Sequence, residues 1–264
     1  MCKKYSCNVK ELKSDNRIVR ITSIEGKHAM SKTNVDVHSL RIENIKTIEY
    51  FTNDFYVKFP HLQNLVICES SLKYLLRGDF AMAENLLNIH ITHTDLAELE
   101  DFVFHGTRIV KMLNLRENKI QEIAESAFKG MMTLKFLMLS HNEIHSLHLK
   151  LFKELSALEQ LSLSSNKIRH IDERLFSKNR NLKTIFLDNN QLKSINGNMF
   201  EHNINLREIY MDNNYIRHIS NNPHFLVELK SLEIATFINN TCVSANILIL
   251  RGFFPPYEMI FATC

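Results

Sequence analysis

The chain has 264 residues, of which 45% are hydrophobic and 23% are charged. This composition is that of an ordinary globular protein and excludes an intrinsically disordered chain. The 32 Lys and Arg against 29 Asp and Glu leave a net charge of only +3. This near-balance argues against a dedicated nucleic-acid-binding protein, because such proteins carry a strong basic excess.

No segment has the length and hydrophobicity of a transmembrane helix. A run of about 18 apolar residues is missing, and the apolar stretch at residues 247–250 is followed by Arg251 and Gly252. Residues 1–4 lead into polar sequence, without the apolar core of a signal peptide. We therefore expect either an intracellular protein or a secreted protein whose signal peptide is not present in this sequence.

Residues 1–36 precede a repeated pattern and are expected to form an N-terminal cap. Three stretches in this segment, residues 5–9, 18–21 and 24–28, read as short strands. A stack of repeats exposes an apolar edge at each end, so a cap is expected at both.

From Val37 to Cys242 the sequence is a repeat array. In the seven copies that begin between Leu62 and Leu206, apolar residues at positions 1, 4, 6, 11 and 14 surround a polar position 9, which is mostly asparagine, and the period is 24 residues. The first copy, at Val37, is degenerate and keeps Leu40 and Ile42, and the last keeps Leu232, Ala235, Phe237, Asn240 and Cys242. The copies begin at Val37, Leu62, Leu86, Val110, Leu134, Leu158, Leu182, Leu206 and Leu232. A single unit cannot bury its apolar face alone, so the units must stack around one continuous core. The pattern predicts a solenoid of about nine repeats with a parallel sheet.

A second periodicity supports the first. Position 19 is phenylalanine in seven copies: Phe55, Phe80, Phe104, Phe128, Phe152, Phe176 and Phe200. Phe225 follows one residue late, after an insertion at residues 221–223. We expect these rings to stack as a spine behind the sheet.

These motifs resemble the leucine-rich repeat family, in the 24-residue "typical" type common in extracellular animal proteins. The resemblance implies an α/β-type repeat solenoid, a curved horseshoe with a parallel concave sheet. Its implied parts are an N-terminal cap (1–36), repeats (37–242) and a C-terminal cap (243–264). It also implies that the position-9 asparagines form a ladder of hydrogen bonds to the backbone, weaker where Ser70 and Thr94 replace asparagine. The lead-in is similar to that of secreted insect proteins of this family.

The resemblance also gives the five cysteines a role. Secreted members close both ends of the array with cysteines, which implies a Cys242–Cys264 disulfide and, at the other end, Cys2–Cys7. The first would close a loop of about 22 residues and stabilise the fold by about 3 kcal/mol. Cys68, at position 7, remains as an exposed free thiol that is inert or, as the alternative, joins another chain. Two alternatives stay open: Cys2 pairs with a cysteine upstream of this sequence, or all five are reduced, as in a cytosolic protein.

One N-glycosylation pattern is present, at Asn239, Asn240 and Thr241. A glycan on Asn239 would fit an extracellular protein. Burial beside the asparagine ladder is the competing expectation, because it would block modification.

The known catalytic and cofactor motifs are missing, so we expect no enzyme, no catalytic residue and no cofactor. His141, His145 and His148 have a ligand-like spacing, but they lie around a turn rather than on one helix face, so no metal site is expected. Asp188 and Asp212 share position 7 in neighbouring repeats and would lie about 5 Å apart. That spacing is conceivable for a glycosidase-like pair, although a binding role is the better interpretation.

Positions 3, 5 and 7 should face out from the sheet, where repeat scaffolds bind partners. Two apolar groups fall there: Met112, Phe136 and Met138, and then Phe186 and Tyr210 with Ile234 and Thr236. A rim of mixed charge includes Arg116, Asp188 and Asp212. Mixed charge suits a protein partner better than an anionic polymer. Exposed aromatic side chains predict a contact patch, although strand propensity alone also places aromatics on sheets.

We therefore expect a non-enzymatic recognition module, secreted or on the cell surface. Its concave face would bind a protein ligand or receptor, and the resemblance implies an innate-immune or receptor-like role. We expect no nucleic acid and no membrane segment, and oligomerisation is left open. The alternatives are an intracellular scaffold or adaptor with reduced cysteines, and a hydrolase that uses Asp188 and Asp212.

Overall fold

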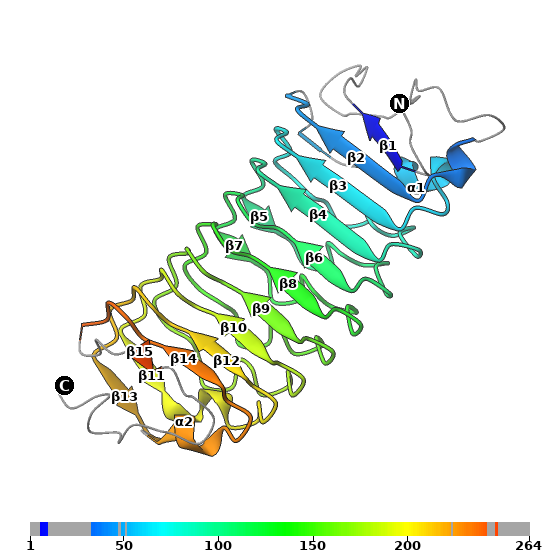
Figure 1. Cartoon of the computed structure of the whole chain (residues 1–264). Coiled ribbons are helices and arrows are strands. Elements are labelled where there is room, and N and C mark those ends of the chain that lie inside the picture. Colours follow the sequence, from blue (N-terminus) through cyan, green and yellow to red (C-terminus); the bar gives the residue numbers. More distant parts are fainter. Residues whose placement is uncertain are drawn as a thin grey trace. The chain divides into compact units, whose positions relative to one another are not determined.

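The computed structural model describes residues 6–9, 33–46, 49–50, 52–222, 224–241 and 246–247. Its chain divides into two compact units, Met1–Leu134 and Lys135–Cys264. Figure 1 shows the elements of both.

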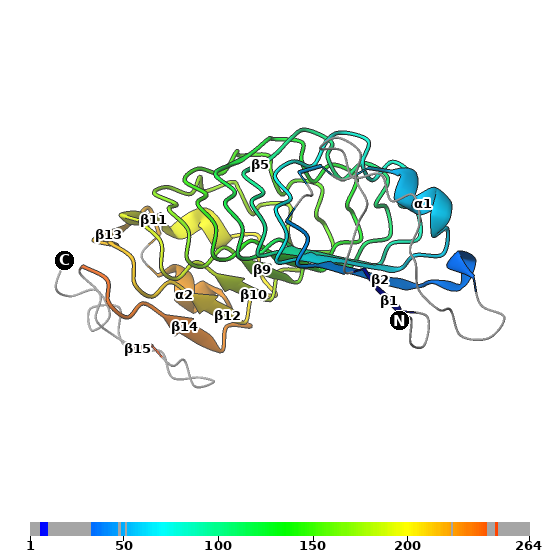
Figure 2. The same cartoon turned by 90° about the horizontal axis from the view of Figure 1, so that it is seen from above.

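Five parallel strands form the main sheet of the first unit. In order across the sheet they are β1 (Ser6–Val9), β2 (Ser39–Glu43), β3 (Asn64–Cys68), β4 (Asn88–Thr92) and β6 (Met112–Asn114). The connecting segments hold η1 (Asn34–Asp36), α1 (Asp54–Lys58), β5 (Glu98–Leu99) and β7 (Glu122–Ile123). β5 and β7 pair with each other. In Figure 2, β1 and β2 lie on one side of this unit, and α1 and β5 lie on the opposite side.

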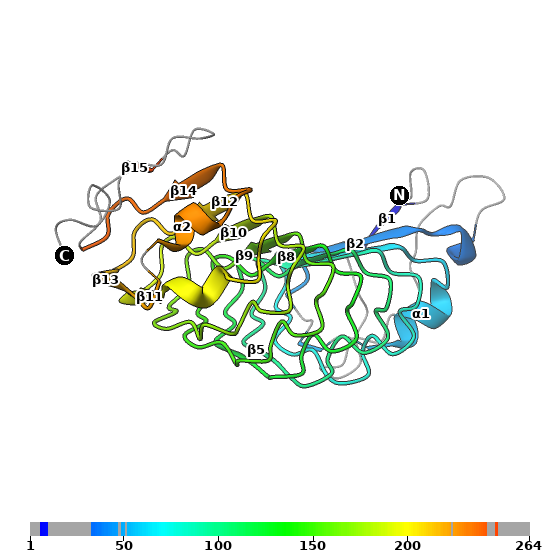
Figure 3. The same ribbon diagram turned by 90° about the horizontal axis from the view of Figure 1, so that it is seen from below.

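Five parallel strands and one antiparallel strand form the main sheet of the second unit. They are β8 (Phe136–Met138), β9 (Gln160–Ser162), β10 (Thr184–Phe186), β12 (Glu208–Tyr210), β14 (Ile234–Thr236) and the antiparallel β15 (Asn246–Ile247). The connections hold β11 (Ser194–Asn196), η2 (Gly197–Phe200), β13 (His218–Ser220) and α2 (Phe225–Glu228). β11 pairs with β13, and Figure 3 shows β11 on the side of the unit away from β12 and β14.

The predicted repeat solenoid is confirmed. Each of the nine expected repeats contributes one strand to a main sheet, four in the first unit and five in the second. Helix is scarce, since α1 has five residues and α2 has four. The strand expected within residues 5–9 forms as β1, whereas those at 18–21 and 24–28 fall outside the described residues. The curvature of the array and the limits of the two caps stay predictions.

The strands form because apolar and polar residues alternate along them. In β4, Ile89 and Ile91 are fully buried, while Asn88, His90 and Thr92 remain partly exposed on the other face. Successive side chains of a strand point to opposite faces, so this alternation places positions 4 and 6 in the core and positions 3, 5 and 7 outside it.

The phenylalanine stack predicted at position 19 forms within each unit. In the first unit, Phe104 lies 5.3 Å from Phe80 and 6.0 Å from Phe128, measured between ring centroids. In the second unit, successive ring centroids of Phe152, Phe176, Phe200 and Phe225 lie 6.0, 5.8 and 6.3 Å apart. Tyr56 joins the first stack unexpectedly, at 6.4 Å from Phe80.

The predicted asparagine ladder is also present, and Asn190 shows its chemistry. The amide nitrogen donates to the backbone oxygens of Leu163 (2.9 Å) and Leu187 (3.2 Å), and the amide oxygen accepts from Ile168 N (3.0 Å). At the same repeat position, Ser70 makes only two hydrogen bonds. Its hydroxyl donates to Cys68 O (2.9 Å) and accepts from Ile45 N (3.1 Å). Buried loop backbone needs such partners, so the ladder is weaker at Ser70, as expected.

Each repeat bends at position 8 through a residue in the left-handed conformation. The φ angles lie between 51° and 59° at Asn44, Glu69, His93, Glu117, His141, Ser165, Asn189, Asn213 and Asn239. Asparagine tolerates this conformation better than other non-glycine residues, yet only four of the nine are asparagine. This turn carries the chain from the strand into the ladder position, and His141 belongs to it.

Candidate functional site

The outward face of the first unit is polar and cross-linked by its own side chains. Asn88 donates its amide nitrogen to the side-chain oxygen of Asn64 at 2.7 Å. Arg41 donates to Glu43 at 2.6 Å. Burial, followed by the charge of Arg41, lowers the pKa of His90, so this imidazole is neutral at physiological pH.

The expectation of an exposed Cys68 thiol is wrong. Cys68 is a free cysteine, as expected, but only 6% of its surface is exposed. Its register partner on the adjacent strand β2 is Glu43, which the Arg41 side chain contacts at 2.6 Å. Burial also raises the pKa of the Cys68 thiol, which makes it less reactive.

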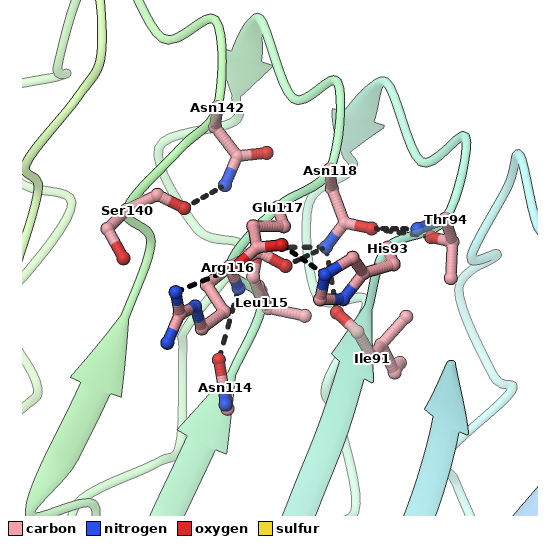
Figure 4. A network of polar contacts seen from close by, with 10 residues as sticks. All are labelled: Ile91, His93, Thr94, Asn114, Leu115, Arg116, Glu117, Asn118, Ser140 and Asn142. Atoms are coloured by element: carbon pink, nitrogen blue, oxygen red, sulfur yellow. Dashed lines mark hydrogen bonds and ion pairs between the residues drawn. The ribbon is translucent and has the colours of Figure 1, made fainter. Parts of the chain in front are cut away.

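Arg116, expected on the binding rim, is engaged at the end of β6 (Figure 4). Its guanidinium pairs with Glu117 at 2.6 Å, and Glu117 also contacts His93. Beside this pair, the ladder residue Asn118 accepts from both the backbone nitrogen (2.9 Å) and the hydroxyl (2.6 Å) of Thr94. The network is therefore part of the turn structure of the first unit.

The expected Met112, Phe136 and Met138 cluster is divided between the two units. Met112 lies on β6 of the first unit, and Phe136 and Met138 lie on β8 of the second. All three side chains are half-buried. Their joint role stays a prediction.

Phe186 and Tyr210 come together on the outward face of the second unit. They occupy position 5 of β10 and β12 and are register partners in the parallel pairing. Their rings are stacked, with centroids 4.8 Å apart and planes inclined by only 6°. Both side chains are half-buried. Burial, then the charge of Glu208, raises the pKa of the Tyr210 phenol.

Three carboxylates surround this stack. Asp188 accepts hydrogen bonds from the Ser164 hydroxyl and the Asn189 amide, both at 2.6 Å. Asp212 accepts from the Thr236 hydroxyl at 2.8 Å and the Ile238 backbone nitrogen at 2.6 Å.

The third carboxylate, Glu208, accepts weakly from Thr184 and from the Tyr210 hydroxyl, both at 3.4 Å. In the part of the chain that the structure describes, none of the three carboxylates lies within ion-pair distance of a basic side chain.

The hydrogen bonds of Asp188 and Asp212 do not support the hydrolase alternative. Each carboxylate is held by its own donors from a neighbouring repeat. A glycosidase-like pair needs one carboxyl group to donate a proton and the other to attack or to activate water, and these donors occupy both oxygens of Asp188 and of Asp212. The arrangement fixes two acceptor groups beside an aromatic surface.

Two lysines next to this face pair with one glutamate. Glu159 contacts Lys135 at 2.7 Å and Lys183 at 2.6 Å, linking three successive repeats. Hydrogen bonds from these two lysines lower the pKa of Glu159 to about 2. Lys135 and Lys183 are therefore engaged with Glu159 rather than with Asp188 or Glu208.

The expected glycosylation residue, Asn239, is exposed, and its amide nitrogen donates to the Asn213 side-chain oxygen at 2.8 Å. The next residue, Asn240, belongs to the ladder, accepting from Ile216 N at 3.1 Å. Cys2, Cys242 and Cys264 lie outside the described residues, and of Cys7 only the backbone in β1 is described. The expected disulfides therefore stay predictions.

Within the described residues, no group of three or more His, Cys, Asp and Glu side chains is arranged to hold a metal ion. The helices of the same residues are too short or too polar for any of them to cross a membrane.

Solved structures similar to this chain share its repeat fold. A chain of the Drosophila Toll–Spatzle complex, described as a hub in development and innate immunity, matches 79% of this chain with 23% identity and a TM-score of 0.72. The leucine-rich repeat domain of APL1B matches 81% with 17% identity and a TM-score of 0.62. A TLR13–ssRNA13 complex matches 80% with 19% identity and a TM-score of 0.59. The chain spans only 28%, 58% and 38% of these proteins.

A search of curated proteins by sequence gives no match. The family model described as "BspA type Leucine rich repeat region" matches six copies, over residues 5–135 and 97–225. These matches extend over more than half of the sequence, and the chain belongs to the BspA-type leucine-rich repeat family.

Proposed function

We propose that this chain is a non-enzymatic recognition module that binds a protein ligand through the outward face of β9, β10, β12 and β14. The observation that carries the proposal is the half-exposed Phe186–Tyr210 stack. Outward positions of a solvated strand usually carry polar groups, whereas aromatic side chains are enriched at the energetic centres of protein interfaces. The stack is already ordered, so a partner would not have to restrict it on binding.

The charge of this face favours a protein over a nucleic acid. The outward positions of the second unit's repeat strands and the position-7 residues that follow them include Asp188, Glu208 and Asp212 and no lysine or arginine. Phosphate backbones are bound mainly by basic side chains, so this face would repel them. Among the similar structures, the Toll complex contains Spatzle and the TLR13 complex contains RNA, and we place this chain with the first kind.

Selection of displayed random peptides on the intact chain tests the proposal. Selected peptides should bind the F186A/Y210A double variant at least about tenfold more weakly than the wild-type chain. Tyr215, whose surface is 57% exposed, offers the matched control, and Y215A should bind with unchanged affinity. If the double variant folds, as judged by circular dichroism, and keeps full affinity, the site is wrong.

We also propose an extracellular location, with Cys242–Cys264 and Cys2–Cys7 disulfides. Intact mass after alkylation, with and without reduction, on protein from a secretory host tests it. Two disulfides and one thiol that alkylates only after unfolding are expected, because Cys68 is buried. Five free thiols in folded protein would instead support the intracellular scaffold. A glycan on Asn239 would add a further mass increment.

A further inference from the structure

Three turns of the first unit lie side by side at the edge of the sheet where its strands begin. We call them the edge turns, and they comprise residues 81–85, 105–111 and 129–133. A Cβ added at Gly106 would lie only 2.9 Å from the backbone oxygen of Ala81, so the second turn packs directly on the first. The Thr133 hydroxyl donates to the backbone oxygens of Arg108 and Val110, both at 2.9 Å, which joins the third turn to the second.

Each edge turn exposes one large apolar side chain. The exposed fractions are 51% for Met82, 40% for Ile109 and 60% for Met132. An exposed apolar residue that stands alone is ordinary, whereas several on adjoining segments with polar residues around them indicate a contact surface. The edge turns therefore have the apolar part of an interface.

The charged side chains of the edge turns are mainly basic. Arg108, Lys111 and Lys129 are exposed, against one exposed acidic residue, Glu84. Among the described residues, none of the three cations lies within ion-pair distance of a carboxylate. Lys129 contacts the ring of Phe102 instead, at 5.1 Å from its centroid. The edge turns thus present cations without acidic partners beside exposed apolar side chains.

The outward face of the second unit has the opposite charge. Its three carboxylates, which have no basic partner among the described residues, surround the aromatic stack; they are Asp188, Glu208 and Asp212. At the centre of this face are Phe186 and Tyr210, and methionine side chains make favourable contacts with aromatic rings. Opposite charges around an apolar centre favour the correct partner and suppress wrong ones. This face is therefore complementary to the edge turns, whereas neither surface is complementary in charge to itself.

We propose that the outward face of the second unit binds the edge turns of a second copy of this chain. The apolar side chains of the edge turns lie against the Phe186–Tyr210 stack, and Arg108 and Lys111 pair with the carboxylates around it. The inference rests on the proposed function and names the protein ligand of that face. Because two different surfaces meet, the contact is heterologous, and copies add head to tail into rings or open chains.

Sedimentation velocity of the intact chain over a range of concentrations tests the proposal. The sedimentation coefficient of the wild-type chain should rise with concentration and fall with added salt, because salt screens exposed charges. R108E/K111E should weaken the association at least about tenfold. The matched control is K193E/R217E, which makes the same change of charge at two exposed residues of the second unit and should associate like the wild-type chain.

The apolar part of the contact has its own variant. M82S/I109S/M132S should also weaken the association at least about tenfold. L76S removes an apolar side chain of the first unit that is 41% exposed and lies outside the edge turns, and it should have little effect.

A mixture of two deficient variants distinguishes a head-to-tail contact from a symmetric one. R108E/K111E keeps the outward face, and F186A/Y210A keeps the edge turns. Each should be monomeric alone, whereas an equimolar mixture should form a heterodimer and nothing larger, because only one compatible pair of surfaces remains. Circular dichroism and the urea midpoint show whether each variant folds, and E208K gives a second variant of the face if F186A/Y210A does not.

A wild-type chain that stays monomeric at submillimolar concentration, full association of R108E/K111E, or a mixture without heterodimer would overturn the inference. Binding to phosphatidylserine vesicles that R108E/K111E abolishes, without self-association, would assign the edge turns to a membrane instead. The proposed function has a separate readout, the displayed peptides and the F186A/Y210A variant. If those peptides need the aromatic pair while the chain stays monomeric, the face binds another protein and only the self-association is wrong.

Discussion

Asp79 provides a test of the physical account of the first unit. Only 7% of its surface is exposed, and among the described residues the carboxylate accepts a single hydrogen bond, from Leu76 N at 2.7 Å. Burial raises its pKa from 3.8 to about 6; the Leu76 hydrogen bond opposes this rise and the charge of Glu100 adds to it. The ionised form is therefore disfavoured in the folded protein, and D79N should stabilise the fold near neutral pH.

The sign and the size of the D79N effect on the free energy of unfolding follow from the difference in the pKa of Asp79 between the folded and unfolded states. A carboxyl group whose pKa is higher in the folded state contributes stability below pH 3.8 and loses it as the pH rises through 6. The shift corresponds to about 3 kcal/mol as an upper bound, and solvent screening reduces this to about 1–2 kcal/mol. D79N keeps an oxygen that can accept from Leu76 N and has no charge to bury.

Urea unfolding followed by circular dichroism suits this chain, which contains no tryptophan. The difference in unfolding free energy between D79N and the wild-type chain should be near zero at pH 4 and should grow to its full value by pH 7. E201Q serves as the control for removing an exposed carboxylate. A difference that stays constant across this range, or that favours the wild-type chain at pH 7, would refute the reasoning.

Two further predictions concern stability and use the same assay. G106A should destabilise the chain by more than about 3 kcal/mol, because the new Cβ would lie 2.1 Å from the Phe80 backbone oxygen at a φ of +107°. G130A, at the same repeat position, meets nothing within 4 Å and should cost about 1–2 kcal/mol of backbone strain; equal losses would contradict this. N190A should cost about 3–5 kcal/mol by leaving buried backbone groups unpaired, more than S70A, which removes fewer bonds. Similar losses for these two would count against the ladder as described.

The 24-residue period was sufficient to predict most of the fold. It fixed which residues form the nine repeat strands, because a core shared between stacked units requires apolar side chains at the same positions in each. It also predicted the stacks at position 19 and the weaker ladder at Ser70. Two fully buried asparagines, Asn179 and Asn203, share position 22 and donate to backbone oxygens between 2.8 and 3.1 Å. The same period could have revealed them.

The remaining features had weaker signals in the sequence. The left-handed turn at position 8 is occupied by Glu69, His93, Glu117 and Ser165 as well as by asparagines, because stacking of the repeats imposes it regardless of local preference. The short pairs β5–β7 and β11–β13 have two or three residues each, too few to show an alternating pattern.

The candidate site was predictable in position and less so in detail. Register alone places Phe186 beside Tyr210, since both occupy position 5 of adjacent repeats. The hydrogen bonds that separate Asp188 from Asp212 come from side chains of other repeats, Ser164 and Thr236. The burial of Cys68 likewise does not follow from its outward position 7. Such contacts depend on side-chain conformations that position numbers do not contain.

The central claim, that a protein ligand contacts the Phe186–Tyr210 face, is tested most directly by photo-crosslinking. A photoreactive benzoylphenylalanine is placed at position 186 in one protein and at position 215 in another, each is irradiated with a selected peptide ligand, and the product is located by mass spectrometry. The account predicts an adduct from position 186 and none from position 215. An adduct from position 215 alone, with both proteins folded and binding, would contradict it.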